Sequence, residues 1–221
     1  MSNVQWDNSP TRPGLESTDR ERWTNSGRYD PGWSFTANVA AAMVPRTKWL
    51  CDIGCGPFQF LRTVRPDVVY LPADIHAWTN DTEVCDLNKG ELPRGALALC
   101  DVVFLLGVVE YVYDPRALFR ALRHVERMVV TYNPIDTVPR GRKEVGWLSA
   151  LSKDELVSAI IMAGFDIETL TPHSDKTTSI YISAVNRNFG RFRRGLREMR
   201  RFRFRLGRSQ RSGAWRLGPD E

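Results

Sequence analysis

After Pro45 the chain alternates apolar, strand-like runs with helix-like stretches, and this alternation restricts its possible folds more than any other feature. The strand-like runs cover residues 48–53, 68–73, 101–106, 128–132, 165–170 and 179–185, with a shorter strand ending near residue 86. Helix-like stretches lie at residues 33–43, 58–64, 115–124 and 153–163. Such alternation predicts an α/β fold, in which helices cover both faces of a mainly parallel sheet. The short polar link between the last two runs predicts a hairpin and hence an antiparallel edge strand.

The length and composition fit one such domain with a tail at each end. The 221 residues, 42% of them hydrophobic, suffice for one packed domain and are too few for two ordinary enzyme domains. We expect an irregular N-terminal arm or lid over residues 1–32, the α/β domain over 33–186 and a tail over 187–221. No apolar run approaches the ~20 residues of a membrane span and no signal peptide is visible, which predicts a cytoplasmic protein. The four cysteines lack metal-binding or redox spacing, so we expect reduced core thiols and no metal.

The first strand-like run leads into a turn that suits a ligand. It ends at Asp52, and Gly54, Cys55 and Gly56 follow before an apolar helix. Glycines at a strand-to-helix turn let the backbone bend sharply and approach a ligand, at the sheet edge where open α/β folds bind them. A dinucleotide site would place a third glycine where Gln59 stands. The Asp52 carboxylate would repel a pyrophosphate but suits the ammonium of a methionyl group, which favours S-adenosylmethionine over NAD.

Two further acids follow at the ends of the next strands. Asp74 closes an apolar run and precedes Ile75. A carboxylate at this point can accept hydrogen bonds from both hydroxyls of a ribose. Asp86, followed by Leu87, ends a short strand and can accept from the amino group of an adenine. Three carboxylates at successive strand ends predict one site for an amine, a sugar diol and a purine.

With these residues, segment 48–186 resembles the class I, Rossmann-like methyltransferases that use S-adenosylmethionine. Asp52, Gly54 and Gly56 stand where the first family motif has its acid and first two glycines, and residues 106–115 are similar to the family's turn after the fourth strand. The resemblance implies a seven-stranded Rossmann-like sheet and S-adenosylmethionine as cofactor. The cofactor-binding residues that it implies are Asp52, Gly54, Cys55, Gly56, Asp74, Ile75, Asp86, Leu87, Leu106 and Gly107. Phe58 replaces a glycine that is common in the family, which narrows the pocket.

Three residues are candidates for the chemistry of methyl transfer, namely Glu110, Tyr111 and Tyr132. Much of the rate of an in-line displacement comes from orientation, so a base is needed only if the acceptor must lose a proton. Many members of the family have a histidine where Tyr111 stands; tyrosine, with a pKa of about 10, is a poor base but can orient an acceptor. Glu110 can instead be a structural acid of its loop, and Tyr132 is expected to face the acceptor crevice. Tyr29 and Trp33 are expected either in a lid over the cofactor or packed on the sheet.

The C-terminal tail carries the positive charge of the chain. Residues 187–216 hold twelve arginines and one acid, a charge of +11; since the whole chain carries +5, the remainder carries −6. Apolar residues recur at 189, 192, 196, 199, 202 and 206, which predicts one apolar stripe on a basic helix. Such a helix fits an anionic membrane surface, the acidic body of this or a second subunit, or nucleic acid, in that order of preference.

These features favour an S-adenosylmethionine-dependent methyltransferase that acts on a small-molecule, glycan or lipid-linked acceptor, with peripheral membrane contact as an option. One alternative is an RNA methyltransferase that uses the tail for phosphate contacts, although no Asn/Asp-Pro-Pro-Tyr/Phe motif follows the fourth strand. Another is a non-catalytic protein of the same fold, which a pocket filled by Phe58 or Trp78 would indicate. The oligomeric state stays open.

Overall fold

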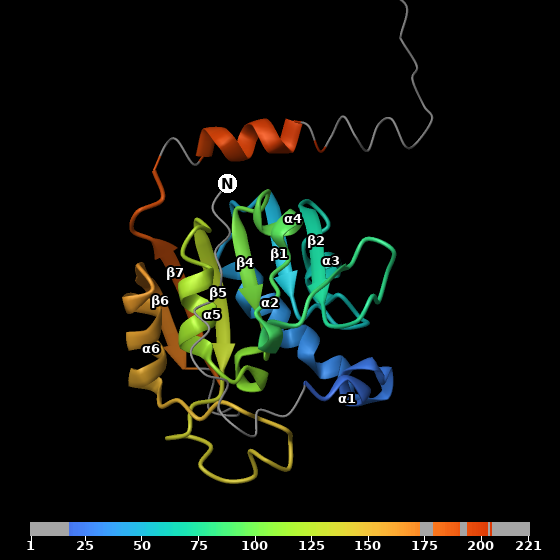
Figure 1. Ribbon diagram of the computed structural model, residues 1–221, viewed down its shortest axis with the longest axis vertical. Helices are drawn as coiled ribbons and strands as arrows, with labels where there is room; N and C mark the ends of the chain where they lie inside the picture. The colour runs from blue at the N-terminus through green and yellow to red at the C-terminus, as the bar shows by residue number, and fades with distance from the viewer. Residues whose placement is uncertain (1–17, 173–178, 191–193, 203, 205–221) are drawn as a thin grey trace, which may run out of the picture.

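The computed structural model describes residues 18–172, 179–190, 194–202 and 204, and a seven-stranded sheet forms its centre (Figure 1). The strands are β1 (Trp49–Ile53), β2 (Val69–Asp74), β3 (Glu83–Val84), β4 (Val102–Leu105), β5 (Arg127–Tyr132), β6 (Phe165–Pro172) and β7 (Ile180–Asn186). They lie side by side in the order β3-β2-β1-β4-β5-β7-β6. Each strand predicted from the sequence is found within a few residues of its expected bounds.

All strands except β7 run in the same direction. β1 pairs in parallel with β2 and β4, β2 with β3, and β4 with β5. β7 is antiparallel to β5 on one side and to β6 on the other, so the hairpin β6–β7 closes this side of the sheet and β6 forms its outer edge. The predicted mostly parallel sheet with an antiparallel pair at the edge is confirmed. Its parallel part brings the carboxyl ends of β1, β2, β4 and β5 to one end of the molecule.

Helices cover both faces of the sheet, as predicted, and each face has its own apolar cluster. The helices of the domain are α2 (Ser34–Ala42), α3 (Phe60–Val64), α4 (Arg94–Leu97), α5 (Pro115–Ala121) and α6 (Lys153–Met162). One cluster joins α2 and α3 to alternate strand residues such as Leu50 and Phe104. The other cluster joins α4, α5 and α6 to the strand residues that point to the opposite face of the sheet, such as Cys51 and Val103. All four cysteines are buried free thiols, as the sequence predicted.

The N-terminal arm is more ordered than predicted. Within residues 18–33, which we call the arm, α1 (Arg20–Thr24) and two short 3₁₀ helices, η1 (Ser26–Arg28) and η2 (Pro31–Trp33), follow one another. The side chain of Asp19 accepts from the backbone N–H of Arg22 and so caps α1. The expectation of an irregular arm is therefore wrong for this part, because local caps order a segment whose composition alone is typical of a loop. The preceding residues, 1–17, lie outside the described residues.

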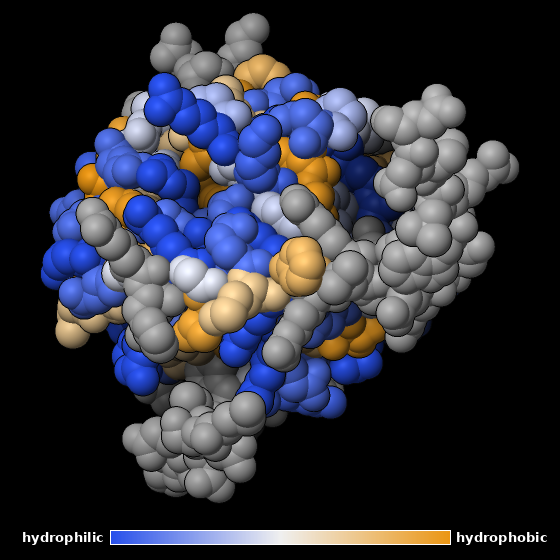
Figure 2. Space-filling model, turned by 90° about the horizontal axis from the view of Figure 1, so that it is seen from above, coloured by the Kyte–Doolittle hydropathy of each residue, from blue (hydrophilic) through white to orange (hydrophobic). Residues whose placement is uncertain are grey.

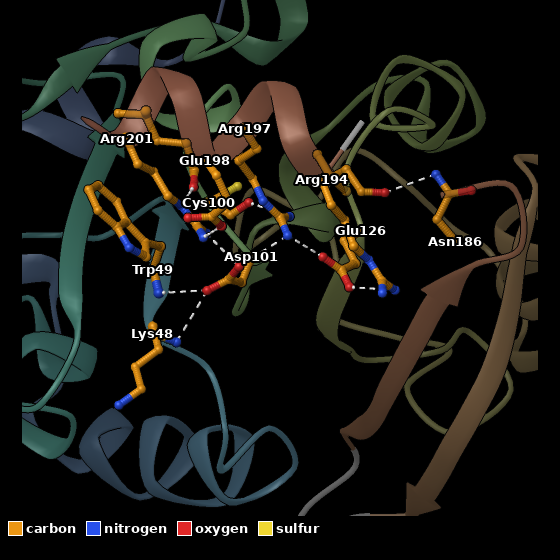
Figure 3. Close-up of polar contacts among 12 residues, drawn as sticks. Lys48, Trp49, Cys100, Asp101, Glu126, Asn186, Arg194, Arg197, Glu198 and Arg201 are labelled. Atoms are coloured by element: carbon orange, nitrogen blue, oxygen red, sulfur yellow. Dashed lines mark hydrogen bonds and ion pairs between the residues drawn. The ribbon is translucent and has the colours of Figure 1, made fainter. Parts of the chain in front are cut away.

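Residues 194–202 and 204 form a C-terminal helix that lies at the end of the sheet where β1, β4 and β5 begin (Figure 1). The side chains of Arg194, Arg197 and Arg201 point toward the domain (Figure 3). Arg197 donates to the carbonyl of Cys100 over 3.0 Å and pairs with Asp101 and Glu126. Arg201 donates to the carbonyl of Leu99 over 2.8 Å and pairs with the same Asp101. Two buried guanidinium groups thus hold the helix on the domain.

Asp101 connects this helix to the sheet itself. Its Oδ2 atom accepts from the backbone N–H groups of Lys48 and Trp49 at the start of β1, over 3.2 and 3.0 Å. The guanidinium of Arg201 lies 5.0 Å from the Trp49 ring centroid, and Phe204 packs edge-on against the same ring at 5.7 Å. The tail therefore does contact the acidic body of its own chain, the second of the three partners weighed from the sequence. In the described ranges, no helix is long and apolar enough to cross a membrane.

Candidate functional site

A cavity of about 320 Å³ opens at the carboxyl ends of the parallel strands. Its size lies within the range of about 300–1,000 Å³ that is usual for small-ligand pockets. All ten residues predicted to bind a cofactor line it: Asp52, Gly54, Cys55, Gly56, Asp74, Ile75, Asp86, Leu87, Leu106 and Gly107. Glu110, Tyr111, Tyr29 and Trp33 line it as well. The structure thus brings together residues that span more than half of the domain sequence.

The turn after β1 depends on its two glycines. Gly54 and Gly56 have φ values of +78° and +60°, in the left-handed region that side chains other than glycine rarely adopt. A Cβ on Gly54 would lie 2.3 Å from Cγ2 of Val108, and one on Gly56 would lie 2.7 Å from the Tyr29 ring. The turn is fixed by bonds from the N–H groups of Gly54 and Cys55 to the carbonyl of Ala73 in β2. Glycine is thus required here both for conformation and for close contact.

Gly54→Ala is expected to lower the free energy of unfolding by about 2 kcal/mol or more, because a left-handed alanine costs about 1–2 kcal/mol and Val108 must also move. Gly141→Ala is the matched control, since Gly141 has φ +73° and no atom lies within 4 Å of the point that a Cβ would occupy. Adding Val108→Ala should recover the steric part of the loss, which urea unfolding of the single and double variants can measure. Strictly additive effects of Gly54→Ala and Val108→Ala would contradict this.

Asp52 is a buried carboxylate with a single strong internal donor. Its Oδ2 accepts from the Tyr70 hydroxyl over 2.6 Å, and the residue is 5% exposed. Burial raises the pKa of Asp52 to about 7, against the Tyr70 hydrogen bond, which lowers it, and with a smaller upward effect from Asp74. A cationic group in the cavity would favour the ionised form, because opposite charges at short range lower the pKa of an acid. The side chain therefore suits an ammonium ligand.

Asp74 ties the end of β2 to the glycine turn. Its Oδ2 accepts from the N–H of Gly56 over 2.9 Å, and its Oδ1 accepts from the N–H of His76 over 3.3 Å. Burial raises the pKa of Asp74, although these backbone hydrogen bonds oppose the shift. A carboxylate offers about four acceptor positions, so Asp74 can share its oxygens between the turn and the polar hydrogens of a ligand. That capacity matches a vicinal diol.

Asp86 is the N-cap residue of a 3₁₀ helix, η3 (Leu87–Lys89), and it contacts the arm. Its Oδ1 accepts from the hydroxyl of Thr18 over 2.7 Å and from the N–H of Asn88 over 3.1 Å. Its Oδ2 is buried and accepts no hydrogen bond from the described residues, and it lies 3.7 Å from the guanidinium of Arg20. This oxygen is thus placed to accept from a donor in the cavity, such as an exocyclic amine.

Glu110, in the 3₁₀ helix η4 (Val109–Tyr111), forms hydrogen bonds with the part of the cavity wall that follows β5. Its Oε1 accepts from both the N–H and the Nδ2 of Asn133, each over 2.9 Å, and its backbone carbonyl accepts from Leu148 and Ser149. Asn133 in turn accepts from the hydroxyl of Ser179 over 2.9 Å. Burial raises the pKa of Glu110, while these hydrogen bonds lower it. Its side chain therefore holds cavity-lining residues in place.

Tyr132 does not line the cavity, contrary to the expectation from the sequence. Its side chain is 0% exposed, and its hydroxyl lies 3.0 Å from that of Ser149 and accepts from Leu151 and Arg142. Successive side chains of a strand point to opposite faces, and the neighbour Thr131 lines the cavity instead. Tyr132 belongs to the core that supports the loop after β5.

Aromatic side chains of the arm line the cavity and pack against aromatic residues of η4 and of the loop after β2. Trp23 packs edge-on against Tyr111 at 4.4 Å between ring centroids, and Tyr29 packs against Trp33 at 5.8 Å and Trp78 at 5.4 Å. The Tyr29 hydroxyl donates to the carbonyl of Trp23, which connects α1 to the segment between η1 and η2. Of the two interpretations left open for Tyr29 and Trp33, this position over the cavity is the lid-like one.

Several cavity residues were not predicted: Thr18, Trp23, Asn88 and Trp147. Trp147 donates from Nε1 to the Tyr111 hydroxyl over 3.1 Å, and the Arg142 guanidinium lies 4.6 Å from its ring centroid. A tryptophan in an otherwise polar segment was the only sequence signal that pointed to Trp23 or Trp147. In the part of the chain that the structure describes, no group of three or more His, Cys, Asp or Glu could hold a metal ion.

No known protein family matches the sequence, and no curated protein matches it either. Several solved structures share its fold. One is a Haloferax volcanii protein described as a methyltransferase, in complex with the methyltransferase activator Trm112, with 15% identity, 77% of this chain and 98% of that chain covered, and a TM-score of 0.58. An S-adenosylmethionine-dependent methyltransferase from Mesorhizobium loti is 20% identical, with 67% and 96% covered and a TM-score of 0.54. Magnesium protoporphyrin IX methyltransferase from Synechocystis PCC 6803 with bound S-adenosylhomocysteine is 16% identical, with 76% and 92% covered and a TM-score of 0.54.

These likenesses identify the fold. The chain has the Rossmann-like fold of class I, S-adenosylmethionine-dependent methyltransferases, as its strand order, its antiparallel β7 and its glycine turn indicate. At identities of 15%, 20% and 16%, the likeness extends to the fold and leaves the reaction to be argued from the cavity.

Proposed function

We propose that this protein is a methyltransferase that binds S-adenosylmethionine in the cavity and methylates a small-molecule acceptor. One observation carries the proposal: Asp52, Asp74 and Asp86, from the ends of three neighbouring strands, line a single cavity. Their order along the sheet matches an ammonium, a ribose and an adenine in turn. A dinucleotide would place a pyrophosphate near Asp52, where two negative groups would repel each other.

The chain supplies a binding partner for each part of this cofactor. Asp52 would pair with the ammonium of the methionyl group, and Asp74 would accept from the ribose hydroxyls beside the glycine turn. Asp86 Oδ2 would accept from the adenine amino group. When bound, S-adenosylmethionine supplies an electrophilic methyl group on a sulfonium. The aromatic walls of the cavity would keep water away from the reacting groups and strengthen the electrostatic contacts.

The acceptor would lie between the arm and the loop after β5. Trp23, Tyr111 and Trp147 offer flat apolar surfaces there, and Asn133 with Ser179 offers polar groups for orientation. Burial raises the pKa of Tyr111, so its hydroxyl stays protonated at neutral pH and would orient the acceptor rather than take its proton. Glu110 acts as a positioning residue through Asn133. This enclosure favours a small, partly apolar acceptor over a glycan or lipid-linked chain.

The open cavity argues against a protein of the same fold that has lost its cofactor pocket. Phe58 lines the cavity but is 44% exposed, and the space beside it stays open at about 320 Å³. Trp78 lies outside the lining and packs against Tyr29 and His76. Neither side chain fills the site, as a lost cofactor pocket would require.

Isothermal titration with S-adenosylhomocysteine tests the cofactor part of the proposal, and NAD is the control ligand. We expect one site per chain for S-adenosylhomocysteine and no heat with NAD. Transfer of an isotopically labelled methyl group from S-adenosylmethionine to a panel of small hydroxyl and amine acceptors then tests the reaction. Binding of NAD in place of S-adenosylhomocysteine would overturn the proposal at its first step.

Cofactor affinity should fall as the pH falls through about 7, by up to about tenfold per pH unit, because the ammonium ligand needs the ionised form of Asp52. The contribution of Asp52 to the stability of the ligand-free fold changes with pH in the opposite direction. The folded-state pKa of Asp52 lies above its unfolded value of 3.8, so its contribution to stability without ligand is full below that value and is lost as the pH rises through about 7.

Tyr70→Phe separates Asp52 from the other carboxylates in this experiment. The substitution removes the hydrogen bond that lowers the pKa of Asp52, so the midpoint of the affinity profile should move to higher pH. Titrations with S-adenosylhomocysteine between pH 5.5 and 8 would measure both profiles. A midpoint that stays in place in Tyr70→Phe would show that Asp52 does not contact the ammonium.

A further inference from the structure

In its described residues, the C-terminal helix has two opposite faces, and one of them makes the contacts with the domain that hold the helix in place. With about 100° between successive residues, Arg197, Arg201 and Phe204 fall on one side of the helix. Leu196, Met199 and Phe202 fall on the opposite side, which we call the outer face. The structure agrees with this geometry. Arg197 and Arg201 are 8% and 6% exposed, whereas Leu196, Met199 and Phe202 are 38%, 60% and 66% exposed.

The outer face is not needed to hold the helix on the domain. The inner face already makes hydrogen bonds to the carbonyls of Leu99 and Cys100, and ion pairs with Asp101 and Glu126. Phe204 packs on Trp49 from the same side. Three large apolar side chains are therefore exposed to water along one line of the helix. Their exposure is unfavourable in free energy, and contacts with the domain do not remove it.

Charged side chains, two arginines and one glutamate, border this apolar line. Arg194 and Arg200 are exposed on the helix beside it, and Arg194 keeps 57% of its side chain in solvent although it pairs with Glu126 at 3.1 Å. Figure 2 looks onto this end of the molecule and shows a band of apolar residues between hydrophilic ones. The sequence from residue 187 to residue 216 contains twelve arginines and one acidic residue. Arg200 thus lies on one side of the apolar line, and on the other side Glu198, which is 63% exposed and pairs with Arg201, lies between Arg194 and Phe202.

We infer that the outer face of the C-terminal helix binds an anionic membrane surface. A helix lying in the interface inserts its apolar line at the boundary of headgroups and acyl chains, and the bordering arginines reach the lipid phosphates. Each basic residue near such a surface adds about 1 kcal/mol of attraction. The face has both of the parts that this mode of binding requires.

Two other occupants fit the face less well. A second copy of the chain would bring two segments of charge +11 together, and like charges repel. A nucleic acid would pair with the arginines through its phosphates but would leave Leu196 and Met199 without an apolar partner. The outer face is also convex, as the exposed side of a single helix, which matches a flat interface better than a groove.

Sedimentation with lipid vesicles tests the inference directly. The full chain should sediment with vesicles made of equal parts phosphatidylcholine and phosphatidylglycerol, and only weakly with phosphatidylcholine alone. Met199→Glu combined with Phe202→Glu should lower the vesicle partition coefficient at least about tenfold, because two apolar anchors are lost and two negative charges are added. Arg200→Gln should lower it about fivefold through charge alone.

Met162→Glu is the matched control. Met162 is 83% exposed at the end of α6 and is not part of the outer face, so its replacement should leave the partition coefficient unchanged. Thermal melting of each variant shows that the fold is intact. Equal partition of Met199→Glu/Phe202→Glu and the unchanged chain would overturn the inference. So would the absence of binding to the anionic vesicles, or tighter binding to an RNA oligonucleotide than to them.

Discussion

Replacing Asp74 by alanine is expected to weaken the binding of S-adenosylhomocysteine at least about 100-fold, while the chain stays folded. Asp74 would accept from both ribose hydroxyls, and each hydrogen bond to a charged group contributes about 1.5–3 kcal/mol. The same side chain fixes the N–H of Gly56, so the glycine turn also loses its tie to β2. The fold should survive because burial already raises the pKa of Asp74, which means that its ionised form costs free energy in the ligand-free protein.

Calorimetric titration measures the loss, and circular dichroism verifies the fold. Asp154→Ala is the control, because Asp154 is an exposed acid in the first turn of α6. Asp74→Asn should fall between the two, since its carbonyl oxygen keeps one acceptor for the turn. If Asp74→Ala bound the ligand as tightly as Asp154→Ala, the ribose assignment and with it the cofactor site would be wrong.

Glu110→Ala should have the second large effect, on both stability and acceptor methylation. The substitution removes the Glu110 oxygen that accepts from the N–H and the Nδ2 of Asn133, and each hydrogen bond to a charged group contributes about 1.5–3 kcal/mol. We expect a loss of about 2 kcal/mol or more in the free energy of unfolding. We also expect at least about a tenfold loss in kcat/KM for the acceptor, because Asn133 lines its side of the cavity.

Glu110→Gln serves as the matched variant. Glutamine keeps one oxygen for the N–H of Asn133 and removes the carboxyl group, so most of the stability should return. S-adenosylhomocysteine affinity should stay within about threefold of the unchanged chain in both variants, since Glu110 is assigned to the acceptor side. A Glu110→Ala chain as stable as the unchanged one would rule out the positioning role.

The sequence predicted the fold and one half of the cavity because both rest on local patterns. Strand ends are visible as apolar runs, and a parallel sheet brings those ends to one edge, so the apolar pattern alone places Asp52, Asp74 and Asp86 together. The left-handed φ of Gly54 and Gly56 follows the same logic, because a sharp strand-to-helix turn favours glycine.

The other half of the cavity could not be predicted because it depends on contacts between distant segments. Thr18 reaches Asp86 and Trp23 reaches Tyr111 through the path of the arm, which no periodicity encodes. The prediction for Tyr132 chose the wrong side of β5 because an all-buried strand has no polar alternation to show which face meets the cavity.

For the tail, too, the local pattern was predictable from the sequence, but the contacts with the rest of the chain were not. Its spacing predicted an apolar stripe on a basic helix, and the described part of the helix has that stripe. Which side would turn inward was not encoded in the spacing. It is decided by Asp101, Glu126 and two backbone carbonyls, which attract Arg197 and Arg201 from the domain side.

The C-terminal helix and the cavity lie at opposite ends of the same parallel strands. Trp49, the first residue of β1, contacts Phe204 of the helix, whereas Asp52, near the last residue of β1, lines the cavity. A lipid surface against that helix would hold the opening of the cavity turned outward, toward the surrounding aqueous phase. If the proposed function holds, the acceptor would then arrive by diffusion through water, and a molecule embedded in the same leaflet would not reach the cavity.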